Sequence, residues 1–283
     1  MPETTLTDQP TGNGAADVVV AVICGRDADA AWLGGFLQQV RVLADQQQLS
    51  ALLDEEKTTS RTVVVVPATT GRNLPFITQT AATLRAARNT GGVRCVLAQP
   101  LGDATQVVSA LKARLRRSAA LQRAVSPSTR PGAPAAGTTT GADTATACGS
   151  DTGAGSYVVV VSTSIDRAGD GELVRQAGLV GDGDSTVAVE VAFDGAEPAV
   201  DDVIAARDNQ PLAIVRADLC APHEGQLPLW DPSSLAAVIG VRAQSALSRM
   251  RTHGTDGIDR PEAHSRPRQH HNTAGVPSHP PRR

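Results

Sequence analysis

Short runs of aliphatic residues recur along the chain, and each is followed by a polar loop and a longer segment with apolar residues at helical spacing. The first run, residues 18–23, contains only valine, alanine and isoleucine. Continuous runs of this type are typical of parallel strands that are buried on both faces. Similar patterns predict further strands at residues 63–66, 93–98, 157–161, 186–193 and 212–215.

Apolar residues at helical spacing predict a helix after each of these strands. In residues 28–53, for example, Trp32, Phe36, Val40 and Leu43 follow a helical period. The other helices are predicted at residues 77–91, 104–121, 173–179, 200–206 and 231–250. Alternating strands and helices predict an α/β fold, and right-handed crossovers then favour a small doubly wound parallel sheet, flanked by helices, in each half.

Composition divides the chain into two halves. Residues 126–156 consist mostly of Pro, Gly, Ala, Ser and Thr, which cannot offset the entropy of ordering. We predict a flexible linker there, a disordered leader at residues 1–16 and a disordered, His-containing tail at residues 251–283. Two lobes remain, at residues 17–125 and 157–250, and the loop at 162–167 holds the place of the loop at 24–27, which suggests a duplication.

Length and charge narrow the class of protein. A chain of 283 residues favours two domains. The net charge of −3 supplies no positive field to attract nucleic acid or an anionic membrane, so we expect neither as a partner. Apolar runs are too short to span a bilayer, and the four cysteines lack the spacing of a disulfide scaffold. Cytoplasmic localisation is therefore expected; the sequence does not indicate the oligomeric state.

Several segments resemble one known family. Residues 187–193 read Val-Ala-Val-Glu-Val-Ala-Phe and are followed by Glu197-Pro198, and residues 63–67 read Val-Val-Val-Val-Pro, with Gly71 two residues before Asn73. These segments and their order resemble the class II chelatases, the sirohydrochlorin cobalt or iron chelatases of cobalamin and siroheme synthesis. The resemblance covers most of both halves. It implies two chelatase-like lobes, a divalent cobalt or iron ion as substrate, a small-molecule tetrapyrrole as partner, and no organic cofactor.

The chain departs from the family at the metal ligands. Members of the family begin with a strand and a His-Gly-Ser-Arg type loop, and carry a second His after a later Gly. Here Cys24 and Asn73 stand at those positions. The resemblance therefore implies Cys24, together with His223 in the corresponding loop of the second half, as metal ligands and catalytic residues.

Cys24 and His223 each have a second interpretation that does not involve a metal ion. A thiolate at Cys24 suits cobalt or iron, but a small buried cysteine at a strand end is also ordinary. His223 lies three residues after Cys220 and beside Glu224, as in a metal-binding loop, yet it also fits an exposed loop histidine.

Charged residues near the predicted strand ends leave similar alternatives. Arg26, Arg72 and Arg167 lie on loops where ligands bind in such sheets. Guanidinium groups there can bind the carboxylates of a tetrapyrrole in bidentate fashion, or can be ordinary surface arginines. Glu190, within residues 187–193, is either a buried acid or a residue at a solvated edge.

Two functions follow. The first is a sirohydrochlorin chelatase-like lyase that inserts cobalt or ferrous iron into a tetrapyrrole. The second is a catalytically degenerate protein of the same fold that binds metal or tetrapyrrole without turnover, which the loss of both His positions favours. A nucleotide-binding protein ranks below both, because neither first-strand loop carries a glycine-rich phosphate signature.

Overall fold

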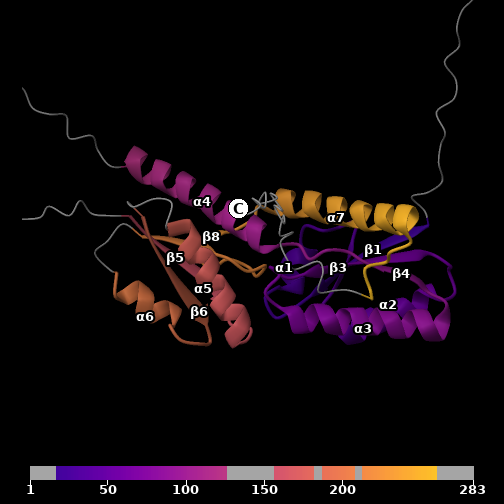
Figure 1. The fold of residues 1–283 in the computed structure, drawn as a ribbon. Coiled ribbons are helices and arrows are strands. Elements are labelled where there is room, and N and C mark those ends of the chain that lie inside the picture. Colours follow the sequence, from indigo (N-terminus) through magenta and orange to yellow (C-terminus); the bar gives the residue numbers. More distant parts are fainter. Residues whose placement is uncertain (1–16, 126–155, 182–186, 208–211, 260–283) are drawn as a thin grey trace, which may run out of the picture.

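The computed structural model describes residues 17–125, 156–181, 187–207 and 212–259, and over these residues the chain forms two lobes that each contain a four-stranded parallel sheet (Figure 1). The first sheet consists of β1 (Val18–Cys24), β2 (Arg41–Leu43), β3 (Thr62–Ala68) and β4 (Arg94–Leu97). The second consists of β5 (Ser156–Thr163), β6 (Val187–Asp194), β7 (Leu212–Arg216) and β8 (Gln226–Pro228).

Both sheets have the same topology. Their strand orders are β2-β1-β3-β4 and β6-β5-β7-β8, and every neighbouring pair is parallel. In each, the chain moves outward to one side after the first strand and then returns to the other side. The prediction of an α/β fold with two similar lobes, each a small parallel sheet flanked by helices, is confirmed.

Two long helices cross between the lobes. Helix α4 (Ala104–Val125) follows β4, but its Leu111 packs with Val160 in the core of the second lobe. Helix α7 (Pro232–His253) follows β8, yet its Ile239 packs with Val66 in the core of the first lobe (Figure 1). The predicted boundaries, 17–125 and 157–250, therefore follow the order of the chain but not the packing of these helices.

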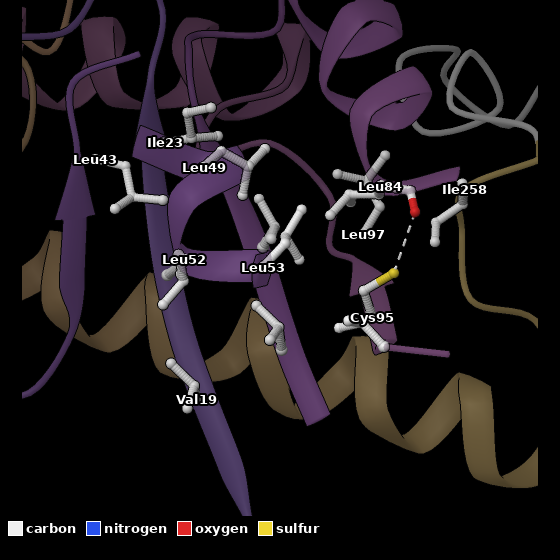
Figure 2. Close-up of a cluster of buried hydrophobic side chains, with 14 of the residues drawn as sticks. Val19, Ile23, Leu43, Leu49, Leu52, Leu53, Leu84, Cys95, Leu97 and Ile258 are labelled. Carbon is white, nitrogen blue, oxygen red and sulfur yellow. Dashed lines mark hydrogen bonds between the residues drawn. The ribbon is translucent and has the colours of Figure 1, made fainter. Parts of the chain in front are cut away.

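The first lobe has a core on each face of its sheet. Helices α2 (Gln46–Glu56) and α3 (Leu74–Gly91) cover one face, where Leu49, Leu53 and Leu84 pack against residues of β1 such as Ile23 (Figure 2). Helix α7 covers the other face together with the short α1 (Ala30–Gly34). In the second lobe, α5 (Arg167–Gly181) and α4 cover one face, and α6 (Val200–Ala205) packs on the other.

The predicted single helix at residues 28–53 is wrong. The segment forms α1, then β2 at the sheet edge, then α2. The side chain of Asp29 accepts a hydrogen bond from the Ala31 N–H at 2.8 Å, and that of Asp45 accepts one from the Gln48 N–H at 2.8 Å, so each begins a separate helix. Two consecutive glycines after Leu33 weaken the first helix, which ends after five residues.

The ordered part of the C-terminus extends beyond the predicted start of the tail. Helix α7 continues to His253, and Gly254 ends it with φ of +63°. The carbonyl of Asp256 then accepts a hydrogen bond from the Leu97 N–H at 2.8 Å, and Ile258 is fully buried in the first core. Residues 251–259 therefore belong to the first lobe; the predicted leader, most of the linker and the remainder of the tail lie outside the described residues.

A buried carboxylate lies at the end of α2. Glu56 accepts hydrogen bonds from the hydroxyl of Thr59 and from the Arg61 Nε at 2.8 Å. Burial on its own raises the pKa of Glu56, but the hydrogen bonds and the positive charge of Arg61 outweigh it and lower the pKa below its usual value.

No helix in the described part of the chain combines the length and the apolar character that crossing a membrane requires.

Candidate functional site

The carboxyl ends of the two sheets meet at the boundary between the lobes. After β1, the chain turns from Gly25 to Ala28, and the next residues pair with the segment after β7. The Leu219 N–H donates to the Asp27 carbonyl at 2.8 Å, and the Asp29 N–H donates to the Leu219 carbonyl at 3.0 Å. Loops from both lobes are thus held side by side at the edge where ligands bind in doubly wound sheets.

A cleft of about 630 Å³ opens at this boundary. Cys24 and Arg26 line it from the loop after β1, Phe76 from the start of α3, and Ile165 and Asp166 from the loop after β5. Its volume lies in the range of small-molecule sites in proteins, about 300–1,000 Å³. The cleft therefore offers an apolar surface together with a thiol, a guanidinium and a carboxylate.

Three helices begin at the cleft. Asp45 caps α2, the side chain of Asn73 caps α3 by accepting from the Phe76 N–H at 3.2 Å, and Asp166 accepts from the Gly169 N–H at 2.8 Å in the first turn of α5. Asp45, Asn73 and Asp166 all line the cleft. Helix N-termini carry partial positive charge, but the carboxylates of Asp45 and Asp166 offset it at α2 and α5. Arg26 and the N-terminus of α3, which a neutral amide caps, are therefore the groups that favour anionic parts of a ligand.

Cys24 is buried at the end of β1, with 5% of its surface exposed. Burial raises the pKa of its thiol to about 12, and the charges of Asp29, Cys220 and Asp27 add to the effect. The thiol is consequently protonated at neutral pH, and a metal ion has to displace that proton in order to bind sulfur.

Arg72 connects the lobes and is not open to a ligand. Its side chain is fully buried. Nε donates to the Thr70 hydroxyl at 2.9 Å, Nη2 donates to the Ser162 hydroxyl of the second lobe at 2.6 Å, and Nη1 lies 3.8 Å from the Asp170 carboxylate. Burial lowers the pKa of Arg72, and the surrounding carboxylates, Asp27 first among them, offset this in part. The donors of Arg72 face the interior and not the cleft, and its role in substrate binding stays a prediction.

Asp27 is a residue of this boundary that sequence reasoning did not single out. It is fully buried, and its Oδ2 accepts from the Thr69 hydroxyl at 2.8 Å and from the Thr70 N–H at 3.0 Å. A comparable group in the second lobe joins Arg216 to Asp218 at 2.8 Å. Buried, hydrogen-bonded carboxylates thus stabilise the loops on both sides of the cleft.

Other predicted site residues lie elsewhere. His223 is exposed, and its backbone forms two hydrogen bonds with Gln226: its N–H donates to Gln226 Oε1 at 3.2 Å, and its carbonyl accepts from the Gln226 N–H at 3.0 Å. Neither His223 nor the exposed Arg167 lines the cleft. Glu190 is partly exposed and pairs with Arg207 at 3.2 Å, as expected for a solvated edge. Cys24 and Arg26 are the two predicted site residues that the structure brings together in this cleft.

Within the described ranges, no group of three or more His, Cys, Asp or Glu side chains is arranged to hold a metal ion. The described residues therefore supply at most two such ligands to a metal ion at one place.

Comparison with known proteins gives structural neighbours only. No family model matches the sequence, and no curated protein matches it. Among solved structures, SirB from Bacillus subtilis with Fe3+ is 13% identical, with 85% of this chain and 99% of that chain covered and a TM-score of 0.46. The sirohydrochlorin chelatase SirB from Bacillus subtilis subspecies spizizenii, in complex with cobalt, is 13% identical, with 83% and 97% covered and a TM-score of 0.44. Residue roles therefore have to come from the geometry of the cleft.

Proposed function

We propose that this protein binds a carboxylate-bearing tetrapyrrole of the sirohydrochlorin type, together with a divalent cobalt or iron ion, in the cleft between its lobes. The observation that supports this most directly is the composition of the cleft. It combines Cys24, Arg26 and the N-terminus of α3 around an apolar surface. The resemblance of residues 187–193 and 63–67 to class II chelatases agrees with it, and the pathway concerned is then cobalamin or siroheme synthesis.

Each group has a role in this proposal. Phe76 and Ile165 pack against the face of the macrocycle, while Arg26 and the N-terminus of α3 bind its carboxylates. Cys24 holds the metal from one side. Insertion of the ion releases two pyrrole protons; we assign Asp166, whose carboxylate is exposed at the cleft, to accept them one at a time and to pass each to solvent.

A binding protein without turnover is the alternative, and two observations favour it. The thiol of Cys24, with a pKa of about 12, is a poorer ligand at neutral pH than a neutral imidazole. The side-chain oxygen of Asn73, at the second family position, already accepts the hydrogen bond that caps α3. Neither position supplies the imidazole that active members use.

An absorbance titration tests the proposal and separates the two alternatives. Sirohydrochlorin is titrated with the full chain without metal, and Co2+ is then added while the macrocycle spectrum is followed. We expect a spectral shift on binding; Co2+ insertion faster than in buffer identifies an enzyme, and insertion at the buffer rate identifies a binding protein.

Arg26→Gln and Arg167→Gln form a matched pair of variants, since both arginines are exposed and only Arg26 lines the cleft. Loss of a charge-assisted hydrogen bond of about 1.5 kcal/mol weakens tetrapyrrole binding roughly tenfold in the first variant. Binding by the second is expected to match the wild type. Absence of a spectral shift with the wild-type chain, or equal affinity of both variants, contradicts the proposed site.

A further inference from the structure

We propose that the side-chain amide of Asn73 donates a hydrogen bond from Nδ2 to a carboxylate of the ligand in the cleft. This inference rests on the proposed function and deepens it, because it names the atom at the start of α3 that recognises the ligand. Position 73, where class II chelatases carry a metal-binding His, then has a different role in this chain, as a donor to the substrate.

The backbone at the start of α3 has few free N–H groups to offer the cleft. Pro75 has no N–H. The Phe76 N–H donates to Asn73 Oδ1 at 3.2 Å, and the Ile77 N–H donates to the Asn73 carbonyl at 3.2 Å. Leu74, the remaining residue of the first turn, does not line the cleft. The donor that this end of α3 presents to the cleft therefore has to come from a side chain.

The amide of Asn73 supplies that donor. Asn73 is 5% exposed and lines the cleft. No acceptor among the described residues takes a hydrogen bond from Nδ2, and Nδ2 is not one of the fully buried side-chain atoms that lack a partner there. The atom consequently reaches the surface of the cleft, where it is available to a ligand.

Two contacts fix which way the amide points. Oδ1 of Asn73 is held by the Phe76 N–H, so Nδ2 lies on the other side of the amide. A Cβ added to Gly25 would lie 3.3 Å from Nδ2 and 3.0 Å from Asp27 Oδ1. The buried carboxylate of Asp27 thus lies on the Nδ2 side, where it favours N–H groups over an oxygen. Even if one N–H of Nδ2 turns toward Asp27, the second remains for a ligand.

Gly25 keeps the amide uncovered. Its φ is not positive, so the backbone does not require glycine there. A Cβ at this position would, however, come within 3.3 Å of Asn73 Nδ2 and 3.2 Å of Phe76 Cδ1. The absence of a side chain at position 25 therefore leaves space between the loop after β1 and the start of α3.

The charges around Asn73 suit a carboxylate. Arg26 lines the same cleft and supplies a positive charge. The charge of Asp27 is offset in the interior: Oδ2 accepts hydrogen bonds from Thr69 and Thr70, and Asp27 is the first of the carboxylates that counter the lowering of the pKa of buried Arg72. Hydrogen bonds to an ionised acceptor are stronger than those to a neutral one, so the amide favours a carboxylate over a carbonyl.

Nuclear magnetic resonance of the 15N-labelled full chain tests the donor with a small probe. The side-chain amide signals of Asn73 are those that disappear in Asn73→Ser. We expect propionate to shift these signals downfield in a saturable manner, and propionamide, which has the same shape without the charge, to leave them in place. The inference is overturned if propionate causes no shift or if propionamide causes an equal one.

Two variants test the same atom with sirohydrochlorin. Ser and Asp cap helices about as well as Asn, so Asn73→Ser and Asn73→Asp keep the start of α3 while removing Nδ2. We expect Asn73→Ser to weaken sirohydrochlorin binding roughly tenfold, and Asn73→Asp to weaken it further, because its carboxylate repels that of the ligand. Asn89→Asp is the matched control: Asn89 is exposed on the same helix and does not line the cleft, so its affinity should equal that of the wild type.

The two titrations separate this inference from the proposed function. Sirohydrochlorin binding that is equal in the wild type, Asn73→Ser and Asn73→Asp rejects the role of Asn73 alone. A propionate shift at Asn73 without sirohydrochlorin binding supports the carboxylate donor and rejects the proposed function.

Discussion

Replacement of Arg72 by methionine tests whether a buried charge joins the two lobes. The substitution keeps a long apolar side chain but removes the donors to Thr70 and Ser162, at 2.9 Å and 2.6 Å. It also removes the positive charge of Arg72, on which Asp27 acts more strongly than any other carboxylate, and so leaves the buried Asp27 without that charge. Breaking a buried pair from one side destabilises proteins by about 3–5 kcal/mol, so we expect Arg72→Met to lower the free energy of unfolding by about 4 kcal/mol.

Part of the stability lost in Arg72→Met should be regained when Asp27 is replaced as well. Because burial lowers the pKa of Arg72, the surrounding carboxylates do not fully offset the desolvation of its charge. Removing both charges, as Arg72→Met with Asp27→Asn, also avoids the uncompensated carboxylate. An amide oxygen at position 27 can still accept from Thr69 and Thr70. The double variant is therefore expected to be about 2 kcal/mol more stable than Arg72→Met alone.

Urea unfolding followed by far-ultraviolet circular dichroism measures these differences. Arg167→Met is the control, because Arg167 is an exposed arginine at the start of α5. It should change the free energy of unfolding by no more than about 0.5 kcal/mol. A loss below about 1 kcal/mol in Arg72→Met, or a double variant no more stable than the single one, refutes the role assigned to Arg72.

Three further predictions concern the scaffold, each measured by urea unfolding unless stated. Gly71 has φ of +79°, and a Cβ added there meets a backbone oxygen at 2.6 Å, so Gly71→Ala should lower the free energy of unfolding by about 2–3 kcal/mol. Gly178 lies on α5 with open space around it, so Gly178→Ala should raise the free energy of unfolding by about 0.5 kcal/mol. Equal effects of the two substitutions contradict this. Leu111 of α4 is buried against β5, so Leu111→Ala should lower the free energy of unfolding by about 3 kcal/mol and accelerate amide hydrogen exchange in β5. Acceleration confined to β1–β4 would contradict the crossing of α4 to the second lobe. The pKa of Glu56 is lowered in the folded state, so the ionised carboxylate stabilises the fold above the unfolded pKa of about 4.3, and this stabilisation is lost as pH falls through the folded pKa. Glu56→Gln should therefore lose less stability than the wild type between about pH 5 and pH 3. Equal losses in the two proteins would argue against this linkage.

The main strands follow from sequence because their burial on both faces leaves an unmistakable apolar run, as at residues 18–23. Strand β8, at Gln226–Pro228, has three residues and no such run, so no pattern distinguishes it from a loop. The helix predicted at 28–53 failed because a helical period in Trp32 and Phe36 says nothing about where the helix stops. The caps at Asp29 and Asp45 decide that locally.

The crossing of α4 and α7 is not readable from sequence for a different reason. An amphipathic helix shows which of its faces is buried, but not which sheet buries it. Leu111 and Ile239 each lie on the apolar face of their helix, and that face fits the sheet of either lobe equally well in sequence. The connections after β4 and β8, residues 98–103 and 229–231, are short, and each leads into a helix that covers the neighbouring lobe.

The candidate site was also only partly predictable from the sequence. Cys24 and Arg26 were found because ligands bind beyond the carboxyl ends of parallel strands, a rule that needs only the strand positions. That rule cannot separate Arg26, which lines the cleft, from Arg72, whose partner Ser162 lies 90 residues along the chain. Nor does it show that Leu219, from the segment after β7, pairs with Ala28 in the loop after β1.

The contacts between the lobes also bear on how the cleft can work. If Phe76 of the first lobe and Ile165 of the second contact one tetrapyrrole, the width of the cleft has to be fixed. The exchanged helices and the buried Arg72–Ser162 hydrogen bond supply that constraint, because both oppose movement of one lobe relative to the other. Arg72→Met should consequently weaken tetrapyrrole binding although Arg72 does not line this cleft, whereas Arg167→Met should not. Unchanged tetrapyrrole affinity in a folded Arg72→Met chain would mean that the helices alone fix the width of the cleft.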